Sequence, residues 1–209
     1  MRIDKAAWPF IAVSLALAAL GFWWLGPGGA GPFLVLTAVF AFFFRDPDRT
    51  GPNDPRLVLS PADGRVMVAG PPDGRAGPPG QWQQITIFLS PMDVHVNRMP
   101  VDGRVTKVEY HPGRFLPAYR RDAGDLNEHT EITIERNGSA IVVRQIVGVL
   151  ARRIVCRVRP GDTVRAGDRF GVMKFGSRMD VFVPLHAVVA VKVTDRVVGG
   201  VTVLARLDP

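Results

Sequence analysis

The stretch Val172-Met-Lys-Phe-Gly-Ser-Arg-Met-Asp-Val-Phe-Val-Pro184 organises the rest of the chain. Residues 181–183 form an apolar, strand-like run at its far end, and Gly176-Ser177 lies at its centre. Glycine has no Cβ and tolerates unusual backbone angles, so the serine hydroxyl behind it can reach the glycine carbonyl. Gly176-Ser177 is therefore either a simple turn or a nucleophile next to the peptide bond that it attacks.

Length and composition set the outer bounds. The 209 residues suffice for one compact domain with an appendage, and not for two large domains. The formal net charge of +7 predicts an anionic partner, either a nucleic acid or an acidic membrane surface. Cys156 is the single cysteine, so an internal disulfide is excluded. We expect no metal site, because Cys-x-x-Cys, His-x-x-x-His and P-loop spacings are missing from the sequence.

The N-terminal part predicts a membrane hairpin. Residues 6–25 carry no charge and match the roughly 20 residues that a helix needs to cross a bilayer. A second apolar run, residues 33–44, follows residues 27–32, whose prolines and glycines predict a turn. Tryptophans near the ends of the first run, and basic residues outside both runs, favour two crossings with both chain ends in the cytoplasm.

Two alternatives compete with the hairpin, and one point stays open. A cleaved signal peptide would explain the first apolar run but not the second. A buried core hairpin of a soluble protein would explain both. Residues 33–44 rise only about 18 Å as a helix, so this run spans a bilayer only if the preceding turn is drawn into the helix.

Residues 45–209 predict a β fold. Proline and glycine recur along this part, and between them lie short alternating β-branched runs at 84–89, 130–135, 140–144 and 188–193. Asn137-Gly138 between two such runs predicts a tight hairpin turn. Sustained helical periodicity is missing. We therefore predict a mostly β protein, a single sandwich-like or barrel-like domain at 45–209 preceded by a hydrophobic helical hairpin at 1–44.

Three polar residues can be combined into a nucleophile, a base and an acid: Ser177, His95 and Asp63. His95 lies between two valines, so strand alternation would place its ring on the face opposite to theirs, and histidine is the usual general base at neutral pH. Asp63 lies in Ser-Pro-Ala-Asp-Gly at 60–64, which also suits an ordinary turn. Spacing alone leaves both interpretations open.

Six motifs occur together and in order along the chain: Asp-Pro at 46–47, Ser-Pro-Ala-Asp-Gly at 60–64, Phe-Leu-Ser-Pro-Met-Asp-Val-His-Val-Asn-Arg-Met-Pro at 88–100, Pro-Gly-Arg-Phe at 112–115, Asn-Glu at 127–128 and Phe-Gly-Ser-Arg at 175–178. This ordered set resembles the phosphatidylserine decarboxylase proenzymes of the short bacterial and archaeal type. The likeness covers nearly the whole chain, including a hydrophobic hairpin ahead of the catalytic domain.

The resemblance implies a self-cleaving enzyme of phospholipid biosynthesis that converts phosphatidylserine to phosphatidylethanolamine. Ser177 would attack the Gly176 carbonyl and divide the proenzyme into a β chain, 1–176, and an α chain, 177–209. Ser177 would become a pyruvoyl cofactor that forms a Schiff base with the lipid amine. Asp63 would orient a histidine that activates Ser177, and His95 would return a proton to the substrate.

The implied partners are the phospholipid substrate and the cell membrane, with the catalytic domain on the cytoplasmic side and no nucleic acid. Arg98 stands where longer members of the family carry a second histidine, and arginine cannot act as a base at neutral pH. The base for self-cleavage is therefore either His95 in both reactions or another histidine such as His129. The lipid backbone, diacyl or ether, and the assembly, monomer or homodimer, also stay open.

Two other functions compete with this one. Residues 172–175 resemble the Met-Lys-Met hairpin of biotinyl carrier domains, with Lys174 as the attachment site, but such carriers lack a membrane hairpin and the motif around His95. A membrane-anchored nucleic-acid binder would explain the charge. However, the arginines of this chain are scattered among acidic residues, and the sequence shows neither a basic helix nor the aromatic pattern that stacks on bases.

Overall fold

The computed structural model describes residues 2–72, 77–149, 153–174 and 176–207. The chain divides into two compact units, Met1–Asp48 and Arg49–Pro209. The predicted domain boundary after residue 44 falls one residue past the last helix of the first unit.

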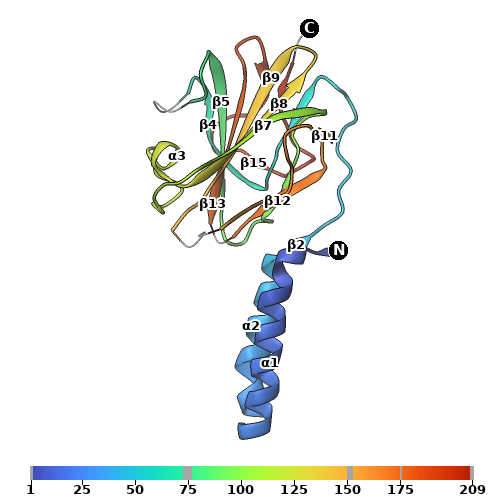
Figure 1. The fold of residues 1–209 in the computed structure, drawn as a ribbon, viewed down its shortest axis with the longest axis vertical. Coiled ribbons are helices and arrows are strands. Elements are labelled where there is room, and N and C mark those ends of the chain that lie inside the picture. The colour runs from blue at the N-terminus through green and yellow to red at the C-terminus, as the bar shows by residue number, and fades with distance from the viewer. Residues whose placement is uncertain (1, 73–76, 150–152, 175, 208–209) are drawn as a thin grey trace. The chain divides into compact units, whose positions relative to one another are not determined.

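The first unit is a pair of helices joined by a single glycine. Gly26, at φ +66°, separates the two long helices, and two short strands at the ends of the unit pair with each other in antiparallel fashion. Figure 1 shows the helices lying side by side. The elements are β1 (Arg2–Ile3), the 3-10 helix η1 (Lys5–Ala7), α1 (Trp8–Leu25), α2 (Pro27–Phe43) and β2 (Arg45–Asp46).

The predicted turn at 27–32 is wrong, because these residues form the first turns of α2. Pro27 occupies the first helical turn, where a backbone N–H has no intrahelical acceptor, so proline is tolerated there. A Cβ at Gly29 would lie 2.3 Å from the Gly21 carbonyl oxygen, so glycine at both positions lets the helices pack closely. With the turn drawn in, α2 has 17 residues and extends about 26 Å.

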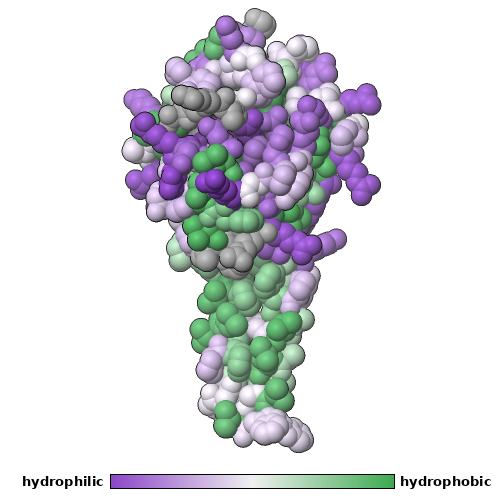
Figure 2. Space-filling model, turned by 60° about the vertical axis from the view of Figure 1, so that its left-hand side comes forward, coloured by the Kyte–Doolittle hydropathy of each residue, from purple (hydrophilic) through white to green (hydrophobic). Residues whose placement is uncertain are grey.

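The surface of the hairpin is apolar. The segment Lys5–Leu25 is long and apolar enough to cross a membrane, and α2 is a shorter apolar helix. Trp23, Trp24 and Leu25 are 75–86% exposed, and Figure 2 shows apolar surface along the helices. Between the helices the hydroxyls of Ser14 and Thr37 lie 2.7 Å apart and share a hydrogen bond. Lipid acyl chains could not offer either hydroxyl a hydrogen-bond partner. This surface suits a lipid environment better than water.

The second unit is built on a curled eight-stranded antiparallel sheet with two small sheets beside it (Figure 1). Its strand order is β11-β7-β8-β9-β13-β5-β4-β15, and the small sheets have the orders β10-β12-β6 and β14-β16-β3. The large sheet consists of β4 (Gly64–Gly70), β5 (Trp82–Leu89), β7 (Gly103–His111), β8 (His129–Arg136), β9 (Ser139–Ile146), β11 (Thr163–Val164), β13 (Ser177–Pro184) and β15 (Arg196–Val197). The other elements are β3 (Leu57–Leu59), β6 (Val96–Arg98), α3 (Ala123–Leu126), β10 (Ile154–Cys156), β12 (Arg169–Met173), β14 (Val188–Val189) and β16 (Val203–Arg206).

The predicted mostly β, barrel-like fold behind a helical hairpin is confirmed. Asn137 and Gly138 both have positive φ and connect β8 to β9, as the tight-turn prediction requires. The strand predicted at 188–193 is too long. It pairs only at Val188–Val189, because the chain then turns, with the Lys192 N–H donating to the Asp195 carboxylate at 2.8 Å.

Strand β13 is the central element of the large sheet. Its first seven residues are buried, because the sheet is covered on both sides at this strand. Met179, Val181 and Val183 belong to the hydrophobic core together with Ile85, Ile87 and Leu89 of β5. Arg178 and Asp180 alternate with them and therefore lie on the opposite face of the sheet.

Close packing of the hairpin can be tested by cross-linking. In a Cys156→Ser background, Ser14→Cys and Thr37→Cys should form an intramolecular disulfide, since the native hydroxyls touch. Gly29→Val should abolish this disulfide, because its Cβ would collide with the Gly21 carbonyl and separate the helices. Gly28→Val is the matched control, because a Cβ there meets no atom within 4 Å. Equal cross-linking in the two valine variants, measured on non-reducing gels, would contradict this packing.

Candidate active site

Ser177 is the first residue of β13 and lies between β5 and β9. Its Cα partner on β5 is Leu89, and the next residue, Arg178, pairs with Ile146 of β9. The side chain of Ser177 is fully buried, and its Oγ has no hydrogen-bond partner in the described part of the chain. A buried hydroxyl without a partner costs free energy, and such a group calls for an explanation. One explanation is that Ser177 is a nucleophile positioned to attack the carbonyl of Gly176.

Gly176 presents that carbonyl. Its φ of +72° lies in the left-handed region, which glycine adopts without steric cost. The Gly176 carbonyl oxygen packs against Gly148, where a Cβ would come within 2.3 Å of it. Only glycine at position 148 therefore allows the backbone of residue 176 to lie where it does. Sequence reasoning missed Gly148, because a single glycine after a strand gives no signal of its own.

His95 is buried, with 1% of its surface exposed. Its Nδ1 lies 2.9 Å from the Asp93 carbonyl oxygen. Since a carbonyl only accepts, we assign the proton of the neutral ring to Nδ1, which leaves the basic lone pair on Nε2. The Met173 N–H donates to the His95 carbonyl at 3.3 Å. Leu89, at the start of segment 89–95, pairs with Ser177, and His95, at its end, bonds to Met173 of β12. Strand β12 leads into Gly176, so both ends of this segment lie next to the Gly176-Ser177 region.

Asp63 lies in the turn before β4, on the other side of β5 from Ser177. The register of β4 and β5 sets Gly64 beside Leu89, so Asp63 is two strand spacings, about 10 Å, from Ser177. Its carboxylate accepts two hydrogen bonds from the Arg49 guanidinium, one of them 2.7 Å long, and one from the Gly199 N–H. Among the described residues, none of its hydrogen bonds goes to a histidine. The orienting role predicted for Asp63 stays a prediction.

The register of the sheet separates His129 from Ser177. His129 pairs with Ile146, which pairs in turn with Arg178, so His129 lies on the sheet face of Arg178. Its Nδ1 lies 2.9 Å from the Asn127 carbonyl, and its ring stacks on His111 at 4.5 Å between centroids. Burial lowers the pKa of the His129 imidazole. Of the two histidines considered for the base, His95 is the one whose backbone bonds to the strand that leads into Gly176, and its role as a base stays a prediction.

Arg98 does not occupy the position of a base. Neighbouring Asn97 accepts a hydrogen bond from Gln145 of β9 at 2.8 Å, so alternation directs Arg98 to the other side of β6. Its guanidinium donates to the Gly167 carbonyl at 3.1 Å, and the side chain lines a cavity of about 750 Å³ that Arg49 also lines.

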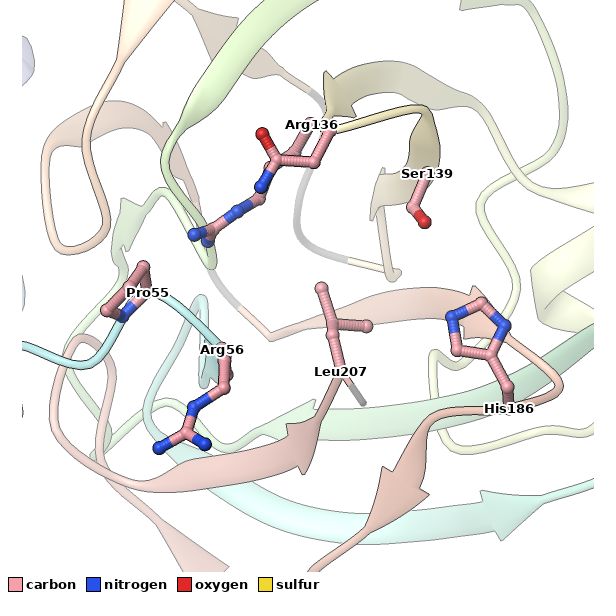
Figure 3. A pocket seen from close by; sticks show the side chains of 7 residues that line it. Pro55, Arg56, Arg136, Ser139, His186 and Leu207 are labelled. Carbon is pink, nitrogen blue, oxygen red and sulfur yellow. The ribbon is translucent and has the colours of Figure 1, made fainter. Parts of the chain in front are cut away.

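A second pocket, of about 340 Å³, is formed by Pro55, Arg56, Arg136, Asn137, Ser139, His186 and Leu207 (Figure 3). Ser177, His95 and Asp63 line neither.

A buried charged network holds the opposite face of β13. The Arg178 guanidinium binds the Asp180 carboxylate through Nε and Nη2 at 2.7 and 2.9 Å, and both side chains are at most 3% exposed. Thr86 and Gln84 of β5 donate to the same carboxylate. The sequence carried a signal for this pair, since two opposite charges two residues apart in an apolar strand must share one face and be paired if buried.

Within the described residues, no group of three or more His, Cys, Asp or Glu side chains could hold a metal ion. The arrangement instead offers a buried serine, the carbonyl before it, and a buried histidine whose backbone bonds to the strand that leads into Gly176. Such a set can support nucleophilic attack and proton transfer with water excluded.

Comparison with known proteins identifies the family of the chain. Residues 36–205 match the family model described as phosphatidylserine decarboxylase. The chain is 42% identical to the phosphatidylserine decarboxylase proenzymes of Granulibacter bethesdensis, over 98% of this chain and 85% of that one, and of Anaplasma phagocytophilum, over 99% and 92%. Identity to the Paramagnetospirillum magneticum proenzyme is 43%, over 99% and 87%. The chain therefore belongs to the phosphatidylserine decarboxylase family, and it is an enzyme that decarboxylates phosphatidylserine.

Proposed function

We propose that this enzyme makes its own pyruvoyl cofactor by cleaving the Gly176–Ser177 bond. The observation that carries the proposal is the buried Ser177 hydroxyl, which has no hydrogen-bond partner in the described residues and follows a glycine with φ +72°. The term proenzyme in the names of the relatives agrees with processing. The products are a β chain, 1–176, which carries the hairpin, and an α chain, 177–209, so that the cut falls inside the catalytic domain 45–209.

Cleavage proceeds by an N-to-O acyl shift. The Ser177 Oγ attacks the Gly176 carbonyl carbon and loses its proton to a base, which converts the amide into an ester and frees the Ser177 nitrogen as an amine. Removal of the Ser177 α-proton then expels the Gly176 carboxylate and leaves dehydroalanine. Water hydrolyses the imine tautomer of this residue, ammonia leaves, and residue 177 ends as a pyruvoyl group.

The surroundings of Ser177 suit a pyruvoyl group. Conversion of Ser177 removes a hydroxyl that bonds to none of the described residues, so no hydrogen bond to them is lost. When present, the pyruvoyl carbonyl supplies the electron sink that a decarboxylation needs. We assign proton transfer, to and from the reacting atoms, to Nε2 of His95. Asp63 stays in the proposal as the predicted acidic residue, and its carboxylate is held by Arg49 and the Gly199 N–H.

We further propose that the hairpin anchors the enzyme in the cell membrane with the catalytic domain on the cytoplasmic side. Support comes from the exposed apolar helices and from the basic residues outside them, Arg2, Lys5, Arg45 and Arg49. A membrane location suits a substrate that resides in the bilayer.

Ser177→Ala should remain one uncut polypeptide without decarboxylase activity, because alanine has no hydroxyl to attack Gly176. The wild-type protein should give two fragments on a denaturing gel, and mass spectrometry should show the 33-residue fragment 177–209 with a pyruvoyl N-terminus. Hydroxylamine, which traps carbonyl groups, should abolish wild-type activity. A cut and active Ser177→Ala protein would refute the proposal.

Gly148→Ala should slow self-cleavage at least about tenfold. The added Cβ would lie 2.3 Å from the Gly176 carbonyl oxygen, so the carbonyl must move away from its present position relative to Ser177. Gly77→Ala is the matched control, because its Cβ would make only an ordinary contact of 3.8 Å with Phe182. Pulse-chase labelling would measure both rates. Equal rates in the two variants would show that the Gly148 contact does not position the carbonyl.

His95→Gln should slow cleavage by at least about a hundredfold, since glutamine has no basic nitrogen. His129→Gln, on the opposite sheet face, should be cut at nearly the wild-type rate. The same gel assay decides between them. The opposite result, with His129→Gln uncut and His95→Gln processed, would move the base to His129.

A further inference from the structure

The segment between β7 and β8, residues 112–127, lies against the cleavage site, and we call it the cover segment. The Arg178 guanidinium donates to the carbonyls of Arg120 and Arg121 at 3.3 and 3.5 Å. Gly124 packs so closely on this guanidinium that a Cβ there would lie 2.9 Å from Nη2. The cover segment is therefore held directly by the residue that follows Ser177.

Two further contacts hold the cover segment to the strand beside Ser177. The Asn127 side chain donates to the carbonyls of Leu116 and Val147, both at 2.8 Å. Ala118 is buried against Gly148, and a Cβ added at Gly148 would lie 3.3 Å from the Ala118 Cβ. Since Gly148 also touches the Gly176 carbonyl, the cover segment reaches the backbone next to Ser177 through Ala118 and Gly148.

The cover segment exposes apolar side chains although its backbone is firmly bonded. Phe115, Tyr119 and Leu126 are 39%, 63% and 41% exposed. Among the described residues of the second unit, the exposed large aromatic side chains are Tyr110, Phe115 and Tyr119, which all lie in the cover segment or just before it. Clustered aromatic exposure of this kind marks an interaction surface.

Basic side chains are interleaved with these apolar ones. Arg114, Arg120 and Arg121 are all exposed, and Arg120 also pairs with Asp122 at 2.7 Å. Two segments that lead to the site add exposed apolar side chains: Met92 follows β5, and Val149 follows Gly148. Aromatic and leucine side chains beside arginines are the composition that lies at the boundary between headgroups and acyl chains.

We propose that the cover segment is a lipid-contacting surface that rests in the interface of the bilayer during catalysis. Phe115, Tyr119 and Leu126 enter the acyl boundary, and the arginines meet lipid phosphates. The serine headgroup can then reach residue 177 without the acyl chains leaving the membrane. The inference rests on the proposed function, because it takes residue 177 as the reacting group. A bilayer is favoured over a second copy of the chain because the substrate is itself a lipid and because the three exposed arginines of the segment outnumber its two aspartates.

The test compares one substrate in two physical forms. Full-length Phe115→Ser/Tyr119→Ser/Leu126→Ser enzyme should lose about tenfold in kcat/KM on phosphatidylserine in phosphatidylcholine vesicles, and stay within about twofold of wild type on soluble dihexanoyl phosphatidylserine. The matched control replaces Leu185, Val188 and Val193, which are 52–55% exposed outside the cover segment, by serine. It should match wild type on both substrates. Equal loss on both substrates, or no loss, would overturn the inference.

A second measurement keeps the inference testable if the triple variant folds poorly. A fluorophore on Tyr119→Cys, in a Cys156→Ser background, should be quenched by vesicles that carry spin-labelled acyl chains. The same fluorophore on Val188→Cys should not be quenched. Absence of quenching at residue 119, or a fall in oligomeric mass in the triple variant, would overturn the inference, the latter in favour of a protein interface. Failure of the proposed function would look different, because the wild-type chain would then stay uncut while the contrast between the two substrates could still be measured.

Discussion

The structure depends on burying the Ser177 hydroxyl where none of the described residues gives it a hydrogen-bond partner. Ser177 begins a strand whose first seven residues are buried, so the hydroxyl can neither reach water nor relax into solvent. Burying an unsatisfied hydroxyl costs on the order of 1–3 kcal/mol. That cost is sustained because β5 pairs with Ser177 itself and β9 pairs with β13 from Arg178 onward, which fixes the backbone here.

The orientation of that hydroxyl follows from the register of β13. Met179, Val181 and Val183 require one face of the sheet, and the Arg178–Asp180 pair requires the other, with its own hydrogen-bond partners. A slip by one residue would place both charges in the apolar core and the three apolar side chains among polar groups. The buried ion pair thus adds little to stability, but it specifies which way Ser177 points, and its arginine holds residues 120 and 121 through their carbonyls.

Glycine provides the close backbone approaches around Ser177. At Gly176 it permits the left-handed φ, at Gly148 it gives the carbonyl room, and at Gly124 it lets a helix backbone rest on Arg178. The same device brings the two hairpin helices together at Gly21 and Gly29. At the close approaches of Gly148, Gly124, Gly21 and Gly29, the absence of a Cβ allows two backbone segments, or a backbone and a guanidinium, to come into contact.

Sequence alone determined the fold class, the helical hairpin, the β8–β9 turn and the family, because these depend on periodicity, on apolar length and on motifs that are local in the chain. It misplaced the turn at 27–32, since proline and glycine are usual breakers but are tolerated in the first turns of a packed helix. Only the tertiary structure decided that His129 lies on the other face from Ser177 and that Arg98 points away. It alone revealed that the Gly176 carbonyl packs against Gly148 and that Arg178 bonds to the carbonyls of residues 120 and 121. These facts depend on which strands pair and in what register, and contacts between residues far apart in the chain leave no local pattern to read.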